Sequence, residues 1–159
     1  MRLWMLKAGL LVGALALGGC LMRDIRWQSV RPPSGVKEQT YRLVTTAYCP
    51  CGTCCGWKRN WYGKPVIAYG PNRGQPKAVG ITASGTRARP GTIAADTTIF
   101  PFGTVMYIPG YGYGVVEDRG GAIKGYHIDL YYNSHKTALQ WGREIKEVKV
   151  WMPQPQRRR

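Results

Sequence analysis

Residues 116–132 read VEDRGGAIKGYHIDLYY, and this segment contains the most informative strand of the sequence. A glycine-rich loop separates two short runs rich in Val, Ile and Tyr, a pattern that predicts two strands joined by a tight connection. Side chains of a strand alternate between two faces, so Ile128 and Leu130 share one face. The other face carries His127, Asp129 and Tyr131. We expect the apolar face to lie in the core and the polar face to lie in a groove.

The remaining sequence also alternates short apolar runs with Gly and Pro. Including the two strands of the opening segment, the predicted strands are residues 41–48, 77–82, 91–96, 103–109, 113–118, 126–132 and 145–151. One helix is predicted, HKTALQW at residues 135–141, with Ser134 as its N-cap and Gly142 at its end. One short helix among about seven strands favours a small, mainly β barrel.

The chain begins MRLWMLKAGLLVGALALGGC, which has the layout of a secretory signal. A positive leader precedes an uncharged apolar run that is too short to cross a membrane comfortably. Residues 17–20, LGGC, resemble a bacterial lipobox, which implies cleavage after residue 19 and lipidation of Cys20. We expect an exported protein anchored by lipid to a bilayer of the cell envelope, on the periplasmic side of the outer or inner membrane. An ordinary signal peptide or a signal anchor is the alternative.

Composition divides the mature chain into three parts. Residues 20–39 are polar and contain two consecutive prolines, which predicts a flexible tether. Residues 40–152 contain the predicted strands and form one domain, and residues 153–159 form a basic, disordered tail. Without the signal, 21 basic side chains oppose 8 acidic ones, a net charge of +13 that favours anionic lipids or wall polymers. Export and the lack of a nucleic-acid-binding motif argue against nucleic acid.

With only eight carboxylates in the chain, each can be considered in turn. Four lie in the tether or next to the helix, where surface pairing accounts for them: Asp24, Glu38, Glu144 and Glu147. The strand-rich region holds the other four: Asp96, Glu117, Asp118 and Asp129. Three aspartates at strand ends beside glycine-rich loops favour convergence on one cleft.

Four segments of the chain resemble the 3D domain, a family named for three aspartates: TAYCPCGTCCGW, GITASGT, AADTTIFPFGTVMYIPGYG and VEDRGGAIKGYHIDLYY. The pattern also resembles the catalytic part of membrane-bound lytic transglycosylase A and of stationary-phase survival cell-wall enzymes. The resemblance covers most of residues 41–151 and implies a double-psi β-barrel of six or seven strands.

Carried onto this chain, the family pattern implies a catalytic site of three aspartates, with Asp129 as the acid/base and Asp96 and Asp118 lining the same cleft. We expect the substrate to contact five further residues: Tyr48, Thr86, Lys124, His127 and Tyr131. The implied activity is that of a peptidoglycan lytic transglycosylase, a lyase that cleaves the β-1,4 bond between N-acetylmuramic acid and N-acetylglucosamine. No cofactor is expected.

The implied chemistry explains why one carboxyl group suffices. Ordinary glycosidases use two carboxylates, whereas in a lytic transglycosylase the 6-hydroxyl of the muramic acid attacks C1 and forms a 1,6-anhydro ring. One residue then donates a proton and later accepts one. Asp129 must therefore be protonated well above the ordinary pKa of about 3.9. Burial and a neighbouring Asp118 would raise its pKa, and Arg119 or Lys124 would lower it.

Two other functions fit the same barrel. A hydrolase would leave a reducing-end muramic acid. A wall-binding module or a scaffold lipoprotein would hold glycan or partner enzymes without cutting.

The motif YCPCGTCCGW places Cys49, Cys51, Cys54 and Cys55 within seven residues. In an exported domain these cysteines are expected to form disulfides, either Cys51–Cys54 nested within Cys49–Cys55 or a crossed pair, Cys49–Cys54 and Cys51–Cys55. A zinc site is not expected, because a structural site usually joins two knuckles and only one cluster is present. No spacing points to either histidine as a metal ligand.

Overall fold

The structure is a computed structural model that describes residues 29–154. The predicted signal peptide, the lipidated Cys20, part of the tether and most of the tail lie outside the described residues. Within residues 29–154, no helix is long and apolar enough to cross a membrane.

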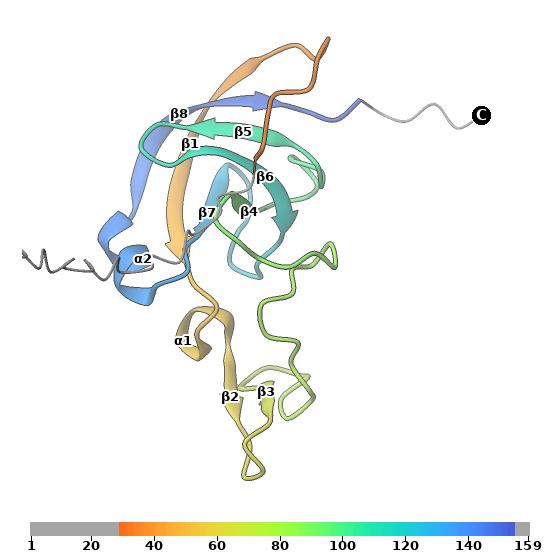
Figure 1. Cartoon of the computed structure of the whole chain (residues 1–159), viewed down its shortest axis with the longest axis vertical. Helices are drawn as coiled ribbons and strands as arrows, with labels where there is room; N and C mark the ends of the chain where they lie inside the picture. Colours follow the sequence, from red (N-terminus) through yellow and green to blue (C-terminus); the bar gives the residue numbers. More distant parts are fainter. Residues whose placement is uncertain (1–28, 155–159) are drawn as a thin grey trace, which may run out of the picture.

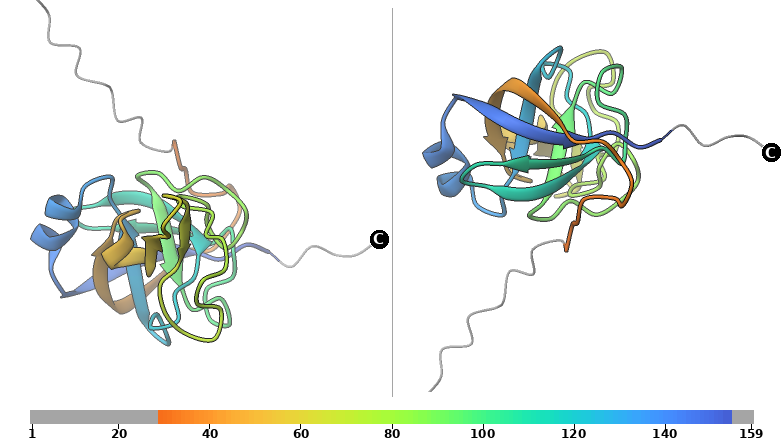
Figure 2. Two further views of the ribbon diagram at one scale, coloured as in Figure 1. Left: turned by 90° about the horizontal axis from the view of Figure 1, so that it is seen from below. Right: turned by 90° about the horizontal axis from the view of Figure 1, so that it is seen from above.

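Six strands close into a barrel (Figure 1). They are β1 (Gln39–Tyr48), β4 (Thr92–Ala95), β5 (Val105–Ile108), β6 (Gly112–Asp118), β7 (His127–Tyr131) and β8 (Glu144–Trp151). Their order around the barrel is β1-β7-β4-β6-β5-β8, and the view from above in Figure 2 shows β8 between β1 and β5. The pairs β1–β7 and β4–β6 are parallel, and the others are antiparallel. The predicted mainly β barrel is therefore confirmed.

The predicted helix is α2 (His135–Trp141), with the expected bounds. Ser134 occupies the N-cap position, although its side chain makes no capping hydrogen bond. Gly142 ends the helix with a φ of 69°, a backbone angle that glycine adopts more easily than other residues. The indole N–H of Trp141 donates to Thr45 Oγ1 on β1 over 3.2 Å and so fixes the helix against the barrel.

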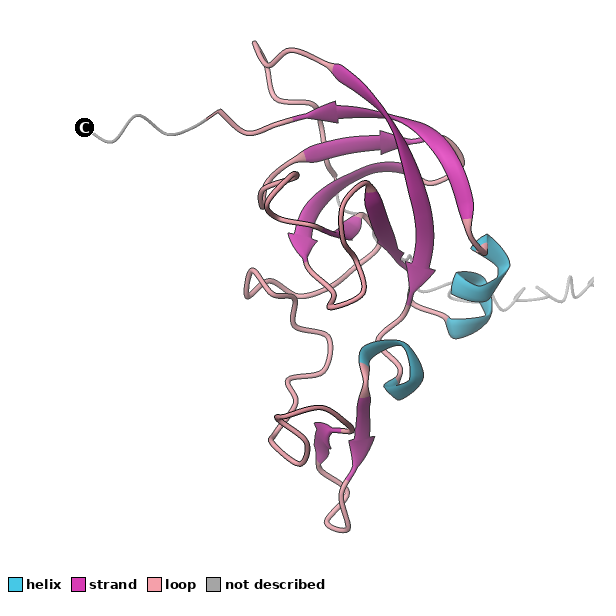
Figure 3. Ribbon diagram, turned by 180° about the vertical axis from the view of Figure 1, so that it is seen from behind, coloured by secondary structure: helices cyan, strands magenta, loops and turns pink. Residues whose placement is uncertain are grey.

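The connection between β1 and β4, residues 49–91, is called the arm here, and it leaves the barrel at one end (Figure 3). It contains the one-turn helix α1 (Gly52–Cys55) and the hairpin β2 (Trp57–Arg59) and β3 (Pro65–Ile67), none of which was predicted. The strand predicted at residues 77–82 is wrong. Gly80, with a φ of 79°, bends this segment, and only one isolated bridge pairs Ile81 with Arg87.

The barrel interior is filled by fully buried apolar side chains from the strands and the loops that join them. They include Leu43, Ile93, Phe100, Met106, Ile108, Val116, Ile128, Leu130, Val148 and Val150. Ile128 and Leu130 thus lie on the core face of β7, as the alternation predicted. A second, smaller cluster of Tyr48, Ala94 and Tyr131 packs with residues of the arm.

The pairing of the strands brings polar residues that are distant in the sequence together on the outer face of the barrel. Thr46 of β1 and Ala94 of β4 are the Cα partners of Asp129 on the two sides of β7. A register shift after Ile93 makes Ala94 also the partner of Asp118 on β6. The small side chain of Ala94 therefore separates the two aspartates in the sheet.

Candidate functional site

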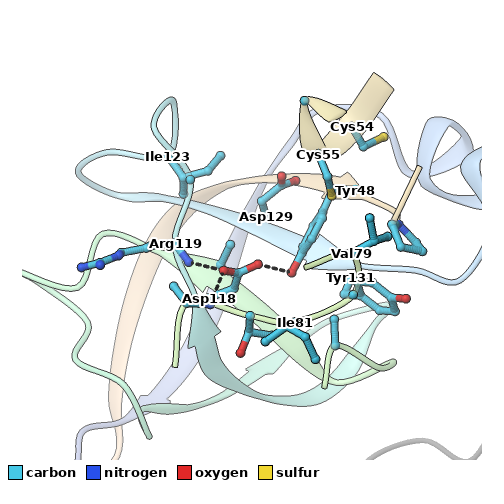
Figure 4. Close-up of a pocket in the computed structure, with 18 of the residues that line it drawn as sticks. Tyr48, Cys54, Cys55, Val79, Ile81, Asp118, Arg119, Ile123, Asp129 and Tyr131 are labelled. Carbon is cyan, nitrogen blue, oxygen red and sulfur yellow. Dashed lines mark hydrogen bonds between the residues drawn. The ribbon is translucent and has the colours of Figure 1, made fainter. Parts of the chain in front are cut away.

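A pocket of about 710 Å³ lies between the outer side of the barrel wall and the arm (Figure 4). Its size is typical of small-molecule and ligand sites. The barrel contributes Tyr48, Ala94, Asp118, Asp129 and Tyr131, and the loop after β6 contributes Arg119 and Ile123. The arm contributes Cys54, Cys55, Tyr69, Lys77, Val79 and Ile81 among others. Asp118 and Asp129 are the acidic residues of this lining.

Asp118, at the end of β6, has hydrogen-bond donors on both carboxylate oxygens. Oδ1 accepts from the backbone N–H groups of Ala83 and Arg119, each over 2.9 Å. Oδ2 accepts from the hydroxyl of Tyr48 over 3.0 Å, as the dashed lines of Figure 4 show. Three donors fix this carboxylate in position.

Asp129 lies in a different environment. The hydroxyl of Thr46 donates to its Oδ1 over 2.7 Å. Burial raises the pKa of Asp129, the hydrogen bond from Thr46 lowers it, and the charge of Asp118 raises it again, so that the net shift is upward. Asp129 is thus the carboxyl group of the pocket that retains a proton at higher pH than an ordinary aspartate.

His127 is linked to Asp129 through the hydroxyl of Thr46. Its Nε2 lies 2.9 Å from Thr46 Oγ1, and the hydroxyl of Thr46 donates to Asp129. Thr46 therefore accepts a hydrogen bond from a protonated Nε2. Burial, followed by the charge of Arg143, lowers the pKa of His127 and favours the neutral ring.

Asp96 and Lys124 do not lie among the residues that line the pocket. Asp96 follows β4, where its Oδ1 accepts from the N–H and the hydroxyl of Thr98, and its Oδ2 accepts from the N–H of Gly125 over 3.0 Å. The hydrogen bond from Gly125, followed by those from Thr98, lowers the pKa of Asp96 to about 2. The observed contacts of Asp96 hold the loop after β6, and Lys124 lies exposed in that loop.

Of the other predicted substrate-contact residues, two line the pocket and one does not. Tyr48 and Tyr131 line the pocket, but Tyr48 is only 8% exposed, so its ring is packed and its hydroxyl is committed to Asp118. Thr86 lies exposed beside the pocket, where its hydroxyl lies 2.8 Å from that of Thr82. The sequence did not point to Thr46 or to Tyr69, an exposed aromatic residue of the lining.

The predicted disulfides are not present, since Cys49, Cys51, Cys54 and Cys55 are all free thiols. The sulfurs of Cys49 and Cys54 are 3.7 Å apart, far beyond a disulfide bond of about 2.05 Å. The Sγ of Cys55 donates to the carbonyl of Cys49 over 3.1 Å.

His135 corrects the expectation that no metal ligand set exists. Its Nδ1 lies among the sulfurs of Cys49, Cys51 and Cys54, and the four atoms all lie within 4.8 Å of one another. The three cysteines precede His135 by 81 to 86 residues, so motif spacing could not connect them.

Comparison with known proteins relates part of the barrel to a known family. The sequence model described as the 3D domain matches residues 91–154, which include β4 to β8 and all three aspartates. Residues 91–154 are thus similar to the 3D domain. The resemblance inferred from the motifs is thereby confirmed.

Two relatives from Bacillus subtilis (strain 168) carry cell-wall names. The cell wall-binding protein YocH is 38% identical over 87 residues, which are 54% of this chain and 30% of YocH. YabE, named for cell wall shaping, is 36% identical over 58 residues, which are 36% of this chain and 14% of YabE. The chain thus spans less than a third of the length of either relative.

Solved structures of the lytic transglycosylase MltA from E. coli also show similarity. The apo-2 form of its D308A variant is 24% identical, covering 51% of this chain and 30% of that one, with a TM-score of 0.40. MltA with bound chitohexaose is 25% identical, covering 50% and 30% of the two chains, with a TM-score of 0.40.

Proposed function

We propose that this protein acts on peptidoglycan as a lytic transglycosylase, with Asp129 as the single acid/base. The observation that carries the proposal is the contrast between the two carboxyl groups of the pocket. Asp129 is partly buried and has a raised pKa, whereas both oxygens of Asp118 accept hydrogen bonds from fixed donors. Asp129 is suited to proton transfer, whereas Asp118 is held in one position by its hydrogen bonds.

Asp118 is poorly placed to act as a nucleophile or as a base for water. Attack by either of its oxygens would require loss of hydrogen bonds from Ala83, Arg119 or Tyr48. A glycosidase with two working carboxylates is therefore less consistent with the site than an enzyme with one. Burial and, to a smaller extent, the charge of Asp118 raise the pKa of Asp129. The charge of Asp118 would also stabilise positive charge developing at C1 of the sugar.

In the proposed reaction, Asp129 donates its proton to the glycosidic oxygen as the bond from C1 of N-acetylmuramic acid to that oxygen breaks. The 6-hydroxyl of the same sugar then attacks C1, and its proton passes to Asp129. The products are a 1,6-anhydromuramic acid end and a free 4-hydroxyl on N-acetylglucosamine. No water is consumed, and Asp129 returns to its starting protonation state.

The same proposal places the protein in the cell envelope. The names of both Bacillus relatives refer to the cell wall, and the leader with its lipobox supports export and a lipid anchor on Cys20. The basic surplus of the chain suits binding to anionic polymers of the wall or to anionic lipids.

A wall-binding module without catalysis is the second candidate, and the name of YocH, a cell wall-binding protein, favours it. Such a module would use the same pocket to hold glycan. The two candidates differ in whether the proton of Asp129 is needed.

The test compares the release of soluble glycan from purified sacculi by the wild type, Asp129→Asn and Glu147→Gln. Loss of the acid/base is expected to lower the rate by about 10²–10⁴-fold. Glu147 is exposed on β8, so its variant serves as the control and should retain the wild-type rate. If the wild type pellets with sacculi but releases nothing, the binding module is correct and the catalytic proposal is wrong.

A further inference from the structure

Cys49, Cys51, Cys54 and His135 form a cluster beside the pocket that the proposed reaction does not use. Cys49 follows β1, Cys51 caps α1, Cys54 lies within α1, and His135 opens α2. Figure 3 shows the two helices next to each other at the base of the arm. We propose that these four residues bind one zinc ion, which joins the arm to the barrel.

The distances within the cluster fit a tetrahedral zinc site. Zinc binds thiolate sulfur at about 2.3 Å and imidazole nitrogen at about 2.0–2.1 Å, so tetrahedral geometry separates two sulfurs by about 3.8 Å and a sulfur from the nitrogen by about 3.6 Å. The Cys49 and Cys54 sulfurs are 3.7 Å apart. The His135 Nδ1 lies 3.7, 3.5 and 3.4 Å from the sulfurs of Cys49, Cys51 and Cys54.

Hydrogen bonds alone do not explain this convergence. Nδ1 of histidine carries either one proton or one lone pair, so it cannot form good hydrogen bonds to three thiols at once. A cation at the centre would accept electron pairs from all four atoms together. Three cysteines and one histidine are a ligand set typical of structural zinc, which leaves no coordination position open for catalysis.

The local backbone supports the same geometry. Cys51 is the N-cap of α1, and its sulfur accepts a hydrogen bond from the N–H of Cys54 over 3.4 Å. Gly56 ends the turn in the left-handed region with a φ of 62°. A side chain at Gly52 would clash with the carbonyl of Trp57, so a tight turn between the ligands depends on glycine there.

The zinc ion would act on the pocket through Tyr48. This residue immediately precedes Cys49, and its hydroxyl fixes Asp118. Cys54 both belongs to the cluster and lines the pocket. The ion would therefore hold the arm over the aspartates, which is a positioning role and not a catalytic one.

The test uses the purified full chain, reduced and reconstituted with Zn²⁺, followed by measurement of bound metal per chain. We expect one zinc ion in the wild type and loss of stoichiometric binding in His135→Ala and Cys51→Ser. Cys55→Ser is the matched control and should retain the ion, because Cys55 lies outside the ligand set. Substitution with Co²⁺ should give thiolate-to-cobalt charge-transfer bands in the wild type and in Cys55→Ser.

Thermal unfolding with and without a chelator provides a second measurement on the wild type, so the test does not depend on a variant that folds. The chelator should lower the Tm of wild type and Cys55→Ser alike. Absence of bound zinc after reconstitution would overturn the proposal. Mass spectrometry showing the loss of two hydrogens per cysteine pair in the protein from its native compartment would overturn it as well, since disulfides would then occupy these sulfurs.

Discussion

The three aspartates of the family pattern have different environments, and hydrogen bonding accounts for the difference. Asp96 accepts from Thr98 and Gly125, and Asp118 accepts from three donors, whereas Asp129 accepts from Thr46 and is partly buried. The sequence singled out Asp118 and Asp129, and both residues line the pocket. It could not reveal Thr46, because the contact of Thr46 with Asp129 spans 83 residues and depends on the parallel register of β1 and β7.

The pH dependence of activity should respond to the two neighbours of Asp129 in opposite directions. An acid is active while protonated, so activity falls as the pH rises through its pKa. Asp118→Asn removes a charge that raises this pKa, so the decline should move to lower pH. Thr46→Val removes a hydrogen bond that lowers the pKa, so the decline should move to higher pH.

Rates of glycan release measured over about five pH units, from pH ~4 to ~9, would check these two opposite shifts. Circular dichroism of each variant controls for folding. Shifts in the same direction for both variants would contradict the assignment of Asp129 as the acid.

Stability should also depend on Asp129. Its pKa is raised in the folded state, so the folded protein binds more protons than the unfolded chain between the ordinary pKa and the raised one, and stability falls as the pH rises through that window. Asp129→Asn removes the partly buried charge while keeping an acceptor for Thr46. We expect its Tm near neutral pH to equal or exceed that of the wild type, and a clearly lower Tm would contradict the account.

At the scale of elements, the barrel strands and α2 were predictable because their apolar residues alternate and because Ser134 and Gly142 bound the helix. The hairpin of β2 and β3 was not predictable, since each strand has three residues and β2 contains Lys58 and Arg59. The segment 77–82 has the composition of a strand, but Gly80 bends it and no barrel edge is available to it.

The two faces of the barrel strands predict different effects of truncation. Ile128 on β7 is fully buried, so Ile128→Ala should lower the free energy of unfolding by about 2–5 kcal/mol. Ile145 on β8 is 60% exposed, so Ile145→Ala should change it by less than about 0.5 kcal/mol. Urea unfolding followed by circular dichroism measures both, and equal losses would contradict the assignment of faces.

At the scale of the whole molecule, the barrel supplies the aspartates and the arm supplies most of the apolar lining opposite them. That residues 49–91 form a separate arm was not predictable from the sequence, because the contacts that fix it come from His135 of α2 and from the end of β6, where Glu117 and Asp118 accept hydrogen bonds from the arm. The cysteine motif was expected to form a self-contained disulfide loop, whereas its sulfurs converge on His135.

The most direct test of the proposed activity is the mass of the soluble muropeptides that the mature protein releases from purified sacculi. An intramolecular attack by the 6-hydroxyl gives products that are one water lighter than those of hydrolysis. We predict that the released glycan ends carry 1,6-anhydromuramic acid and that Asp129→Asn releases none above background. Products that end in a reducing muramic acid would show that water is the attacking group and would contradict the single-carboxyl mechanism.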